Sequence, residues 1–283
     1  MSVLDGFVRK HDYLICVDSD GCVMDTMNCK HFHCFGPLMV HEWALEQWQD
    51  EILRRWNEIN LFQMTRGINR FAGLAIALAE ISKKYTPIIG VAGLQRWVDT
   101  TPALSNDELE KAIAHCEDDD TKSCLTKALQ WSVLVNDRIN RLPEELKKPF
   151  PGAKDCLAFA HEFADVAMVS SAPRDAMEEE WEQFGLMPHT DIILAQDVGS
   201  KEYCIQKLLE FGYGPQNVLM IGDASDDRDA AEQAGIWFYP ILVNWEEESW
   251  EELTEGALDL FKAGSYGSIQ ADKTQVFIEN LGG

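Results

Sequence analysis

Residues 17–26 read Val17-Asp18-Ser19-Asp20-Gly21-Cys22-Val23-Met24-Asp25-Thr26, and they continue the apolar run Tyr13-Leu14-Ile15-Cys16-Val17. An apolar run of this length, rich in residues that favour strands, predicts a buried β-strand. Residues two apart in an extended segment point the same way, so we expect Asp18 and Asp20 to face one spot. Two carboxylates so placed repel each other unless a cation or a shared proton lies between them. The stretch therefore predicts a ligand site at the carboxyl end of a strand, where open α/β sheets bind ligands.

The bulk composition is that of an ordinary globular enzyme. The chain has 283 residues, 46% hydrophobic and 25% charged, and its formal net charge is −24. This length suggests one large domain or two modest ones. A surface this acidic repels phosphate backbones, so we expect no nucleic-acid partner, and a phosphorylated substrate would need a local cationic trap. No apolar run approaches the roughly 18 residues of a membrane span, so we expect no membrane partner and a cytoplasmic location.

Eight cysteines are scattered along the chain. Because we do not expect secretion, reduced thiols are a better interpretation than disulfides. One cluster, Cys29-Lys30-His31-Phe32-His33-Cys34, looks like a metal site at first sight. Its potential ligands are spaced too tightly for the usual zinc patterns, so we interpret it as a loop with incidental soft side chains.

The segment from about 38 to 142 has helical periodicity. Large apolar residues recur along it at intervals of two to four, as at Trp48, Ile52 and Trp56, among charged and amide side chains. This pattern is typical of amphipathic helices, and no strand pattern interrupts it. The segment Leu142-Pro143-Glu144-Glu145-Leu146-Lys147-Lys148-Pro149-Phe150-Pro151-Gly152 then forms a boundary, because three prolines and a glycine cannot continue a helix.

After this boundary, strands and helices alternate. We predict strands at 165–170, 192–195, 218–223 and 237–242. Such alternation implies a parallel sheet with right-handed crossovers. The predicted fold class is therefore α/β, a doubly wound parallel sheet with an all-helical segment inserted after the first strand. The sheet domain would comprise 1–27 and 148–283, with 28–147 as the insertion. Residues 246–263 predict an acidic helix, and the last twenty residues have no assignment.

Four short motifs end the predicted strands or begin the helices that follow them. They are Asp18-Ser19-Asp20-Gly21, Ser170, Lys201 and Gly222-Asp223-Ala224-Ser225-Asp226-Asp227. In this order they resemble the four motifs of the haloacid dehalogenase-like (HAD) hydrolase superfamily, and Phe150-Pro151-Gly152-Ala153 resembles the family's Pro-Gly turn after its cap. The resemblance covers about residues 13 to 240. It implies a Rossmann-like core, a helical cap of the first type, and membership of the phosphatase and phosphomutase branch.

The acidic side chains of these motifs suit phosphoryl transfer, which depends on positioning and charge neutralisation. Asp18 is the candidate nucleophile, since a carboxylate can form an aspartyl-phosphate. Asp20 would act as general acid and then as general base. Asp223, with Asp227 favoured over Asp226, supplies oxygen ligands for Mg²⁺, the expected cofactor. We expect Asp18 and Asp20 around the same ion, and the resemblance implies that Asp20 contributes its backbone carbonyl.

The remaining candidate residues would contact the substrate. Ser170 can donate a hydrogen bond to a phosphoryl oxygen, and the neighbouring Ser171 is a further candidate. Lys201 adds a point charge where a dianion meets several carboxylates. In the inserted segment, Arg66 and Arg70 are candidate contacts because arginine binds phosphate in a bidentate manner.

The sequence therefore predicts a Mg²⁺-dependent phosphomonoester hydrolase that acts on a small soluble phosphorylated metabolite through an aspartyl-phosphate. A sugar phosphomutase with the same residues stays open as an alternative. A 2-haloacid dehalogenase fits Asp18 but not Asp20 or the acidic fourth motif, because carbon–halogen displacement needs neither a metal nor an acid on that side. A non-catalytic binding protein on this fold would be expected to lose Asp18, Asp20 or Asp223, and all three are present. Neither the metabolite nor the oligomeric state follows from the sequence.

Overall fold

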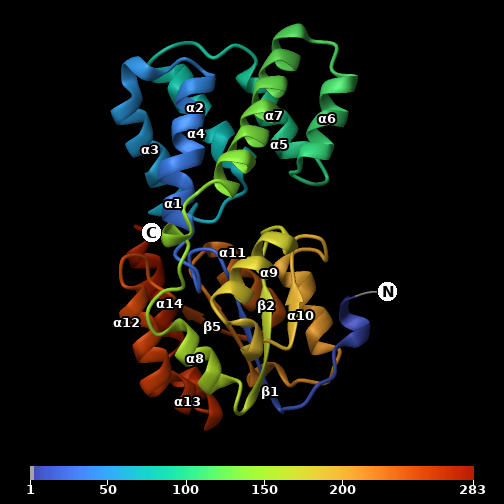
Figure 1. Cartoon of the computed structure of the whole chain (residues 1–283), viewed down its shortest axis with the longest axis vertical. Helices are drawn as coiled ribbons and strands as arrows, with labels where there is room; N and C mark the ends of the chain where they lie inside the picture. The colour runs from blue at the N-terminus through green and yellow to red at the C-terminus, as the bar shows by residue number, and fades with distance from the viewer. Residues whose placement is uncertain (1–2) are drawn as a thin grey trace. The chain divides into compact units, whose positions relative to one another are not determined.

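The computed structural model describes residues 3–283, apart from the side chain of Ala176, and divides into two compact units (Figure 1). The core unit comprises Met1–Met27 and Glu144–Gly283, and the helical unit comprises Asn28–Pro143. Residues 144–147, which the sequence analysis assigns to the insertion, belong to the core unit. Glu144 accepts a hydrogen bond there from the side-chain amide of Gln183, at 2.9 Å.

The core unit is built on a five-stranded, all-parallel sheet. Its strands, in the spatial order β3-β2-β1-β4-β5, are β1 (Tyr13–Val17), β2 (Ala164–Val169), β3 (Ile192–Leu194), β4 (Val218–Gly222) and β5 (Trp237–Pro240). The chain winds outward from β1 to β3 and then returns to the other side of β1 for β4 and β5. Such a reversal leaves a crevice at the carboxyl ends of the strands. The predicted α/β class with a doubly wound parallel sheet is confirmed.

Helices cover both sides of this sheet (Figure 1). They are α8 (Ala153–Ala160), α9 (Arg174–Gln183), α10 (Lys201–Leu209), α11 (Ser225–Ala234), α12 (Glu246–Glu252), α13 (Leu258–Lys262) and α14 (Gln270–Asn280). Helices α10 and α11 pack against each other, whereas α8 packs against β2 and α12. Because both faces are covered, β2 and β4 are buried along their whole length and almost entirely apolar.

The register of the sheet brings three strand ends level. Val17, the last residue of β1, pairs with Met168 of β2 and with Ile221 of β4. The residues that follow β1, β2 and β4 therefore lie at the same edge of the sheet. This edge carries the residues that the sequence singles out.

The C-terminal segment covers the outer edge of β5. The predicted helix over 246–263 is formed by α12, a π-helical turn (Leu253–Ala257) and α13. The last twenty residues contain α14, whose Gln270 accepts a hydrogen bond from the backbone N–H of Phe238 at 3.0 Å. The hydroxyl of Tyr266 donates to the backbone carbonyl of Phe238 at 2.8 Å. Side chains thus satisfy an edge that would otherwise pair with another chain.

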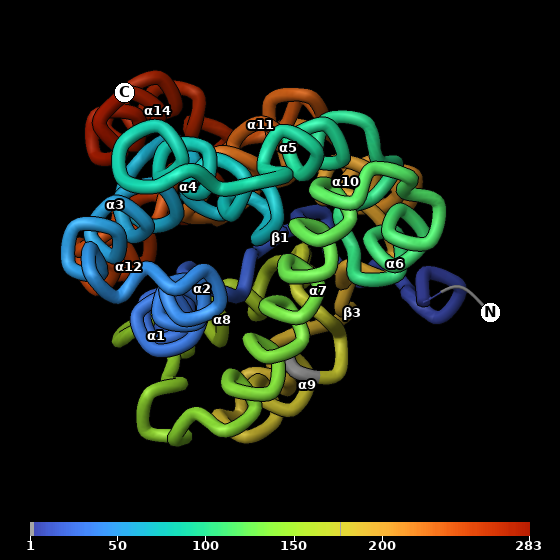
Figure 2. Tube along the Cα trace, turned by 90° about the horizontal axis from the view of Figure 1, so that it is seen from above, coloured from blue at the N-terminus to red at the C-terminus, as the bar shows by residue number. Residues whose placement is uncertain are grey.

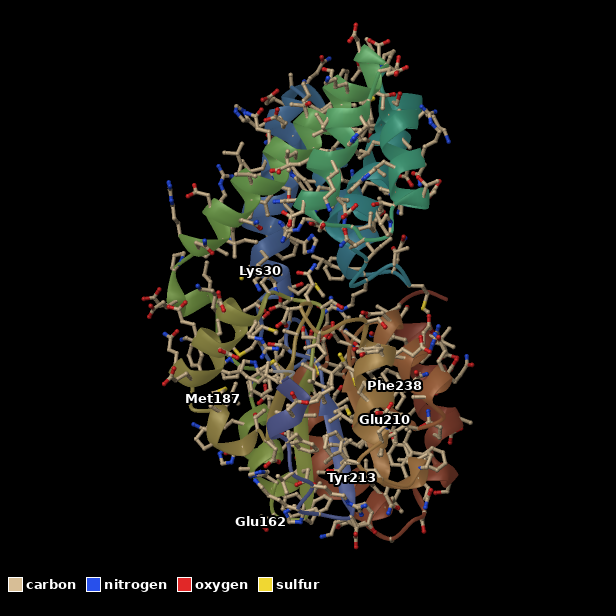
Figure 3. The ribbon with its side chains drawn as sticks, turned by 90° about the vertical axis from the view of Figure 1, so that its right-hand side faces the viewer. Lys30, Glu162, Met187, Glu210, Tyr213 and Phe238 are labelled. Carbon is tan, nitrogen blue, oxygen red and sulfur yellow. The ribbon has the colours of Figure 1, made fainter. Side chains whose placement is uncertain are left out.

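The opposite, amino edge of the sheet carries two buried acids. Asp165 accepts hydrogen bonds from the backbone of Lys10 and from the hydroxyl of Tyr213, the latter at 2.5 Å. Tyr213 and Glu162, which precede β4 and β2, lie toward the lower end of the core unit in Figure 3. Asp191, just before β3, is the second acid. These carboxylates hold the start of the chain against the sheet, far along the strands from the carboxyl edge.

The helical unit has its own apolar core. Its helices are α1 (Met27–Lys30), which begins in the core unit, α2 (Gly36–Glu42), α3 (Gln49–Leu61), α4 (Arg70–Lys84), α5 (Val91–Thr100), α6 (Asn106–His115) and α7 (Asp119–Asn140). Figure 2 shows α2, α3 and α4 nearly end-on, so these three are roughly aligned. Trp56 and Trp131 meet edge to face at 6.0 Å in its centre, and both are fully buried. Ser105 caps α6 by accepting a hydrogen bond from the backbone N–H of Glu108.

All eight cysteines are free thiols, in agreement with the interpretation from sequence. Across residues 3–283, no helix is both long enough and apolar enough to cross a membrane.

Candidate active site

The candidate nucleophile lies at the end of the central strand. Asp18 follows β1 directly, and its backbone N–H donates to the carbonyl of Ile221 in β4 at 3.0 Å. Asp223 follows β4 in the same way. Two acids that are 205 positions apart in the sequence are thereby adjacent in the fold, because β1 and β4 are parallel neighbours.

The turn after Asp18 is closed by its own backbone. The backbone N–H groups of Cys22 and Met24 both donate to the carbonyl of Ser19, and Gly21 N–H donates to the carbonyl of Met24 at 2.8 Å. Gly21 has φ of 85°, a value that side chains other than hydrogen rarely allow. The glycine of the first motif is therefore required by the turn that presents Asp18 and Asp20.

Asp18, Asp223 and Asp227 form a buried cluster of carboxylates. One oxygen from each lies within 4.8 Å of the others, and their residues are 5%, 0% and 0% exposed. Within residues 3–283 this is the one such group of His, Cys, Asp and Glu side chains. The segment 29–34, interpreted from the sequence as a loop, is instead helical: α1 ends at Lys30, and a π-helical turn (His31–Phe35) follows it directly.

Lys201, the first residue of α10, supplies the positive charge. Its ammonium lies 2.9 Å from Oδ2 of Asp18, 2.6 Å from Oδ1 of Asp227 and 3.1 Å from Oδ2 of Asp226. Ser200 caps this helix by accepting a hydrogen bond from the backbone of Tyr203, which sets where Lys201 emerges. One buried ammonium thus joins the first, third and fourth motifs.

Asp227 has two roles at the start of α11. Its Oδ1 faces Lys201, and its Oδ2 accepts hydrogen bonds from the backbone N–H groups of Asp223 and Ala224 at 3.2 and 3.1 Å. The sequence analysis favours Asp227 over Asp226 as a metal ligand. In the structure Asp227 both caps the helix and joins the cluster, whereas Asp226 is more exposed.

Burial dominates the electrostatics of this site. It raises the pKa of Asp18, although the Lys201 ammonium and the Ser170 hydroxyl oppose the rise. It also raises the pKa of Asp227 well above the ordinary value, again against Lys201. Burial alone would lower the pKa of Lys201, but Asp18, Asp226 and Asp227 hold it well above its usual range. The site therefore contains three buried carboxylates, and the single ammonium of Lys201 cannot neutralise all of them.

The donor set fits a hard divalent cation. Three carboxylates and one ammonium have a formal charge of −2, which one divalent ion would balance. All the donors are oxygens, the ligands that Mg²⁺ takes in proteins, usually while it keeps several waters. Asp18, Asp223 and Asp227 are accordingly the residues that could hold the metal.

Asp20 lies beside this cluster without belonging to it. Its carboxylate is half-buried and accepts a hydrogen bond from the hydroxyl of Thr26 at 2.5 Å. A role of Asp20 in metal binding, through its backbone carbonyl, stays a prediction. The sequence analysis assigns no role to Thr26. A hydroxyl six positions after Asp20 is the one feature of the sequence that could have suggested this contact.

The two candidate serines differ in exposure. Ser170 follows β2 and is buried, and its backbone N–H donates to the carbonyl of Leu194 in β3 at 3.0 Å. Ser171 is exposed. The Ser170 side chain hydrogen-bonds to Asp18 and opposes the rise in the pKa of that carboxyl, whereas Ser171 lies at the surface of the core unit.

The candidate arginines belong to the helical unit and have contacts inside it. Arg66 is buried and donates to the carbonyl of Leu61 at 3.0 Å. Arg70 opens α4, donates to the side chain of Asn136 at 2.6 Å, and places its guanidinium 5.1 Å from the ring centre of Phe35. Their role as substrate contacts stays a prediction.

Comparison with known proteins gives a family match. A family model described as haloacid dehalogenase-like hydrolase matches residues 86–241, more than half of the chain. The matched range contains Ser170, Lys201, Asp223 and Asp227, whereas Asp18 and Asp20 lie before it. No curated protein sequence matches the chain.

Solved structures are similar at low identity. A haloacid dehalogenase-like family hydrolase from Streptococcus pneumoniae is 14% identical, with a TM-score of 0.46 over 81% of this chain and 83% of that one. A structure described as a predicted phosphoglycolate phosphatase from Haemophilus somnus 129PT is 14% identical, with a TM-score of 0.48 over 81% and 84%. A HAD-superfamily hydrolase of subfamily IA from Geobacter sulfurreducens PCA is 16% identical, with a TM-score of 0.40 over 83% and 89%. Likenesses of this degree do not identify a substrate.

Proposed function

We propose that this chain, which belongs to the haloacid dehalogenase-like hydrolase family, hydrolyses the phosphate monoester of a small soluble metabolite, with Asp18 as the nucleophile. One observation carries the proposal: the carboxylate of Asp18 contacts the Lys201 ammonium beside two further buried carboxylates. A nucleophile so placed meets positive charge on one side and a cluster suited to a divalent ion on the other. Phosphoryl transfer needs both, because its transition state spreads negative charge over several oxygens.

Asp18, Asp223 and Asp227 would hold the metal, which we propose to be Mg²⁺. When bound, the ion would supply the charge that neutralises the phosphoryl oxygens and offsets the repulsion among the three carboxylates. Lys201 would remain in contact with Asp18 and Asp227 and so fix the carboxylate that attacks.

The proposed reaction has two steps. In the first, an oxygen of Asp18 attacks phosphorus, the bond from phosphorus to the ester oxygen breaks, and Asp20 gives its proton to the departing oxygen. In the second, Asp20 takes a proton from water, whose oxygen attacks the aspartyl-phosphate and breaks its bond to Asp18. Inorganic phosphate leaves, and both acids return to their starting state.

Other side chains would bind the substrate. Ser170 would donate to a phosphoryl oxygen, and Ser171, Arg66 and Arg70 would contact the remaining part of the molecule. The helical unit, inserted between Asp18 and Ser170, would act as a cap that excludes water from the reaction. We also expect a cytoplasmic location, a proposal that the eight free thiols support.

The acidic cluster argues against a dehalogenase, whose displacement at carbon has no use for a divalent ion. A phosphomutase would use the same residues, and its product distinguishes it: an isomerised sugar phosphate in place of free phosphate.

The direct test is release of p-nitrophenol and phosphate from p-nitrophenyl phosphate in the presence of Mg²⁺. We expect turnover that EDTA abolishes, and loss of turnover in Asp18→Asn. Asp12→Asn is the matched control, since Asp12 precedes β1 at its other end and is exposed. After acid quenching, mass spectrometry should find phosphate on the peptide that contains Asp18. Full activity of Asp18→Asn would refute the assignment of the nucleophile.

A further inference from the structure

The turn that carries the catalytic acids is held from outside by two tryptophans. This turn, residues 18–24, is buried apart from Asp20. Its own backbone bonds close it, yet they do not attach it to the helices around it. The backbone N–H of Phe150 also holds the turn from outside, by donating to the carbonyl of Val23 at 2.8 Å. The attachment to the surrounding helices is made by two indole N–H groups, one from each of two helices.

Trp181 reaches the turn from α9. Its residue is 0% exposed, and its Nε1 donates to the hydroxyl of Ser19 at 2.9 Å. Ser19 is equally buried, and its backbone N–H lies 2.7 Å from Oδ1 of Asp18. The contact therefore touches the residue between the candidate nucleophile and the candidate general acid.

Trp250 reaches the same turn from α12, near the other end of the chain. It is also 0% exposed, and its Nε1 donates to the backbone carbonyl of Cys22 at 3.2 Å. Gly152, with φ of 81°, lies beside it, and a Cβ there would stand 3.3 Å from that of Trp250. Because residue 152 is a glycine, the backbone there can lie close to Trp250 while the indole packs against the turn.

The two contacts flank Asp20. An indole has a single N–H donor, so each of these hydrogen bonds also fixes the orientation of a large rigid ring. Removing the N–H leaves a buried acceptor unsatisfied and frees that side of the turn. Since Asp18 and Asp20 must be placed to within a fraction of an ångström, small displacements of the turn would reduce the rate.

We propose that Trp181 and Trp250 are positioning residues that hold the turn 18–24 through Ser19 and Cys22, and so set the placement of Asp18 and Asp20. The inference rests on the function proposed above. It concerns the chemical step and not substrate affinity, because the two indoles act through Ser19 and Cys22 on the turn that carries the acids.

The test compares Trp181→Phe and Trp250→Phe with Trp237→Phe. Trp237 makes the same kind of bond, from Nε1 to the carbonyl of Gln216 at 2.9 Å, but it lies at the amino end of β5. We expect kcat to fall about tenfold to a hundredfold in the first two variants, with KM within about twofold of wild type. The control should keep both values. An unchanged kcat in Trp181→Phe, or a rise in KM alone, would overturn the proposal.

Hydrogen exchange of the backbone separates this inference from the function itself. Exchange in peptides covering residues 18–24 should quicken in both variants and not in Trp237→Phe. If the wild-type protein hydrolyses no phosphate ester, the proposed function fails, and this exchange alone decides whether the tryptophans hold the turn. Equal exchange in all three variants would refute it.

Ser19→Ala removes the acceptor of the same hydrogen bond with little change in side-chain volume. This variant replaces Trp181→Phe in the test if Trp181→Phe does not fold. A double-mutant cycle of the two substitutions should show strong coupling, since either one removes the same hydrogen bond. Additive losses of kcat would contradict the route through Ser19.

Discussion

The ammonium of Lys201 lies 2.6 Å from Oδ1 of Asp227, and the two residues come from the consecutive helices α10 and α11. The same ammonium reaches Asp18, which is 183 positions earlier in the chain. A single side chain therefore neutralises both the proposed nucleophile, Asp18, and one of the carboxylates that could bind metal, Asp227. Its loss should affect both the fold of the core unit and its chemistry.

We predict that Lys201→Met destabilises the protein by about 3–5 kcal/mol, because it leaves Asp18 and Asp227 buried without their counter-charge. Urea unfolding at neutral pH measures this. Mg²⁺ should restore part of the loss by supplying the missing charge. Lys207→Met is the matched control on the same helix, since Lys207 pairs with Glu210 at the surface. Equal stability of the two variants would show that the buried ion pairs contribute nothing.

We predict that Gly222→Ala weakens metal binding without removing any ligand. A Cβ at position 222 would lie 2.2 to 2.4 Å from the side-chain atoms of Asp227, so that carboxylate must move. Isothermal titration should show Mg²⁺ affinity reduced about tenfold or more, in the range of other changes that misorient ligands. Gly256→Ala is the control, because a Cβ there meets nothing within 4 Å. Unchanged affinity in Gly222→Ala would argue that Asp227 is not a ligand.

The convergence of the acids could be predicted from sequence for a simple reason. Asp18 and Asp223 each follow an apolar run, and parallel strands end at one edge of their sheet. The all-helical insertion was visible in its periodicity and in the prolines that close it. These patterns involve residues close together in the sequence, so they can be recognised without knowledge of the fold.

The remaining contacts depend on residues that only the fold brings together. Trp250 donates to Cys22, which is 228 positions away, and a tryptophan in an acidic helix carries no local sign of such a partner. Gln270 and Tyr266 satisfy the edge of β5 with side chains, so the segment beyond residue 263 shows no strand pattern that could have placed it. The sequence also hides that Asp227 both caps α11 and joins the carboxylate cluster, because an aspartate suits either use.

We predict that Thr26→Val lowers kcat about tenfold. Asp20→Asn, which removes the proposed general acid, should cost more, about a hundredfold. The substitution keeps the shape of the side chain but removes the hydroxyl that donates to Asp20. KM should stay within about twofold, since the bond orients a proton donor and does not bind substrate. Thr190→Val, which loses a hydroxyl at the amino edge of the sheet, is the control. An equal effect of both valine variants would mean that Thr26 acts through general stability.

Asp191 gives the core unit a stability that depends on pH. Burial alone would raise the pKa of this carboxyl, but the hydrogen bonds from Lys10, the backbone of Val166 and His161 together lower it below its usual value. The groups that face it are the Lys10 ammonium at 2.6 Å and the imidazole of His161 at 3.0 Å. A folded pKa below the unfolded value of about 3.9 means that the stabilisation is present above that pH and is lost as pH falls through the folded pKa.

We therefore predict that Asp191→Asn costs on the order of 1 kcal/mol at pH 7, where the wild-type carboxylate is charged, and progressively less as the pH falls below about 4. Urea unfolding of both proteins across this range measures the difference. Asp155→Asn, at an exposed position of α8, should show no such dependence. The acid lies at the amino edge of the sheet, so phosphatase activity per folded molecule should be unaffected at neutral pH. A difference in stability that stays constant from pH 7 to pH 3 would mean that the charge of Asp191 is not what holds the start of the chain to the sheet.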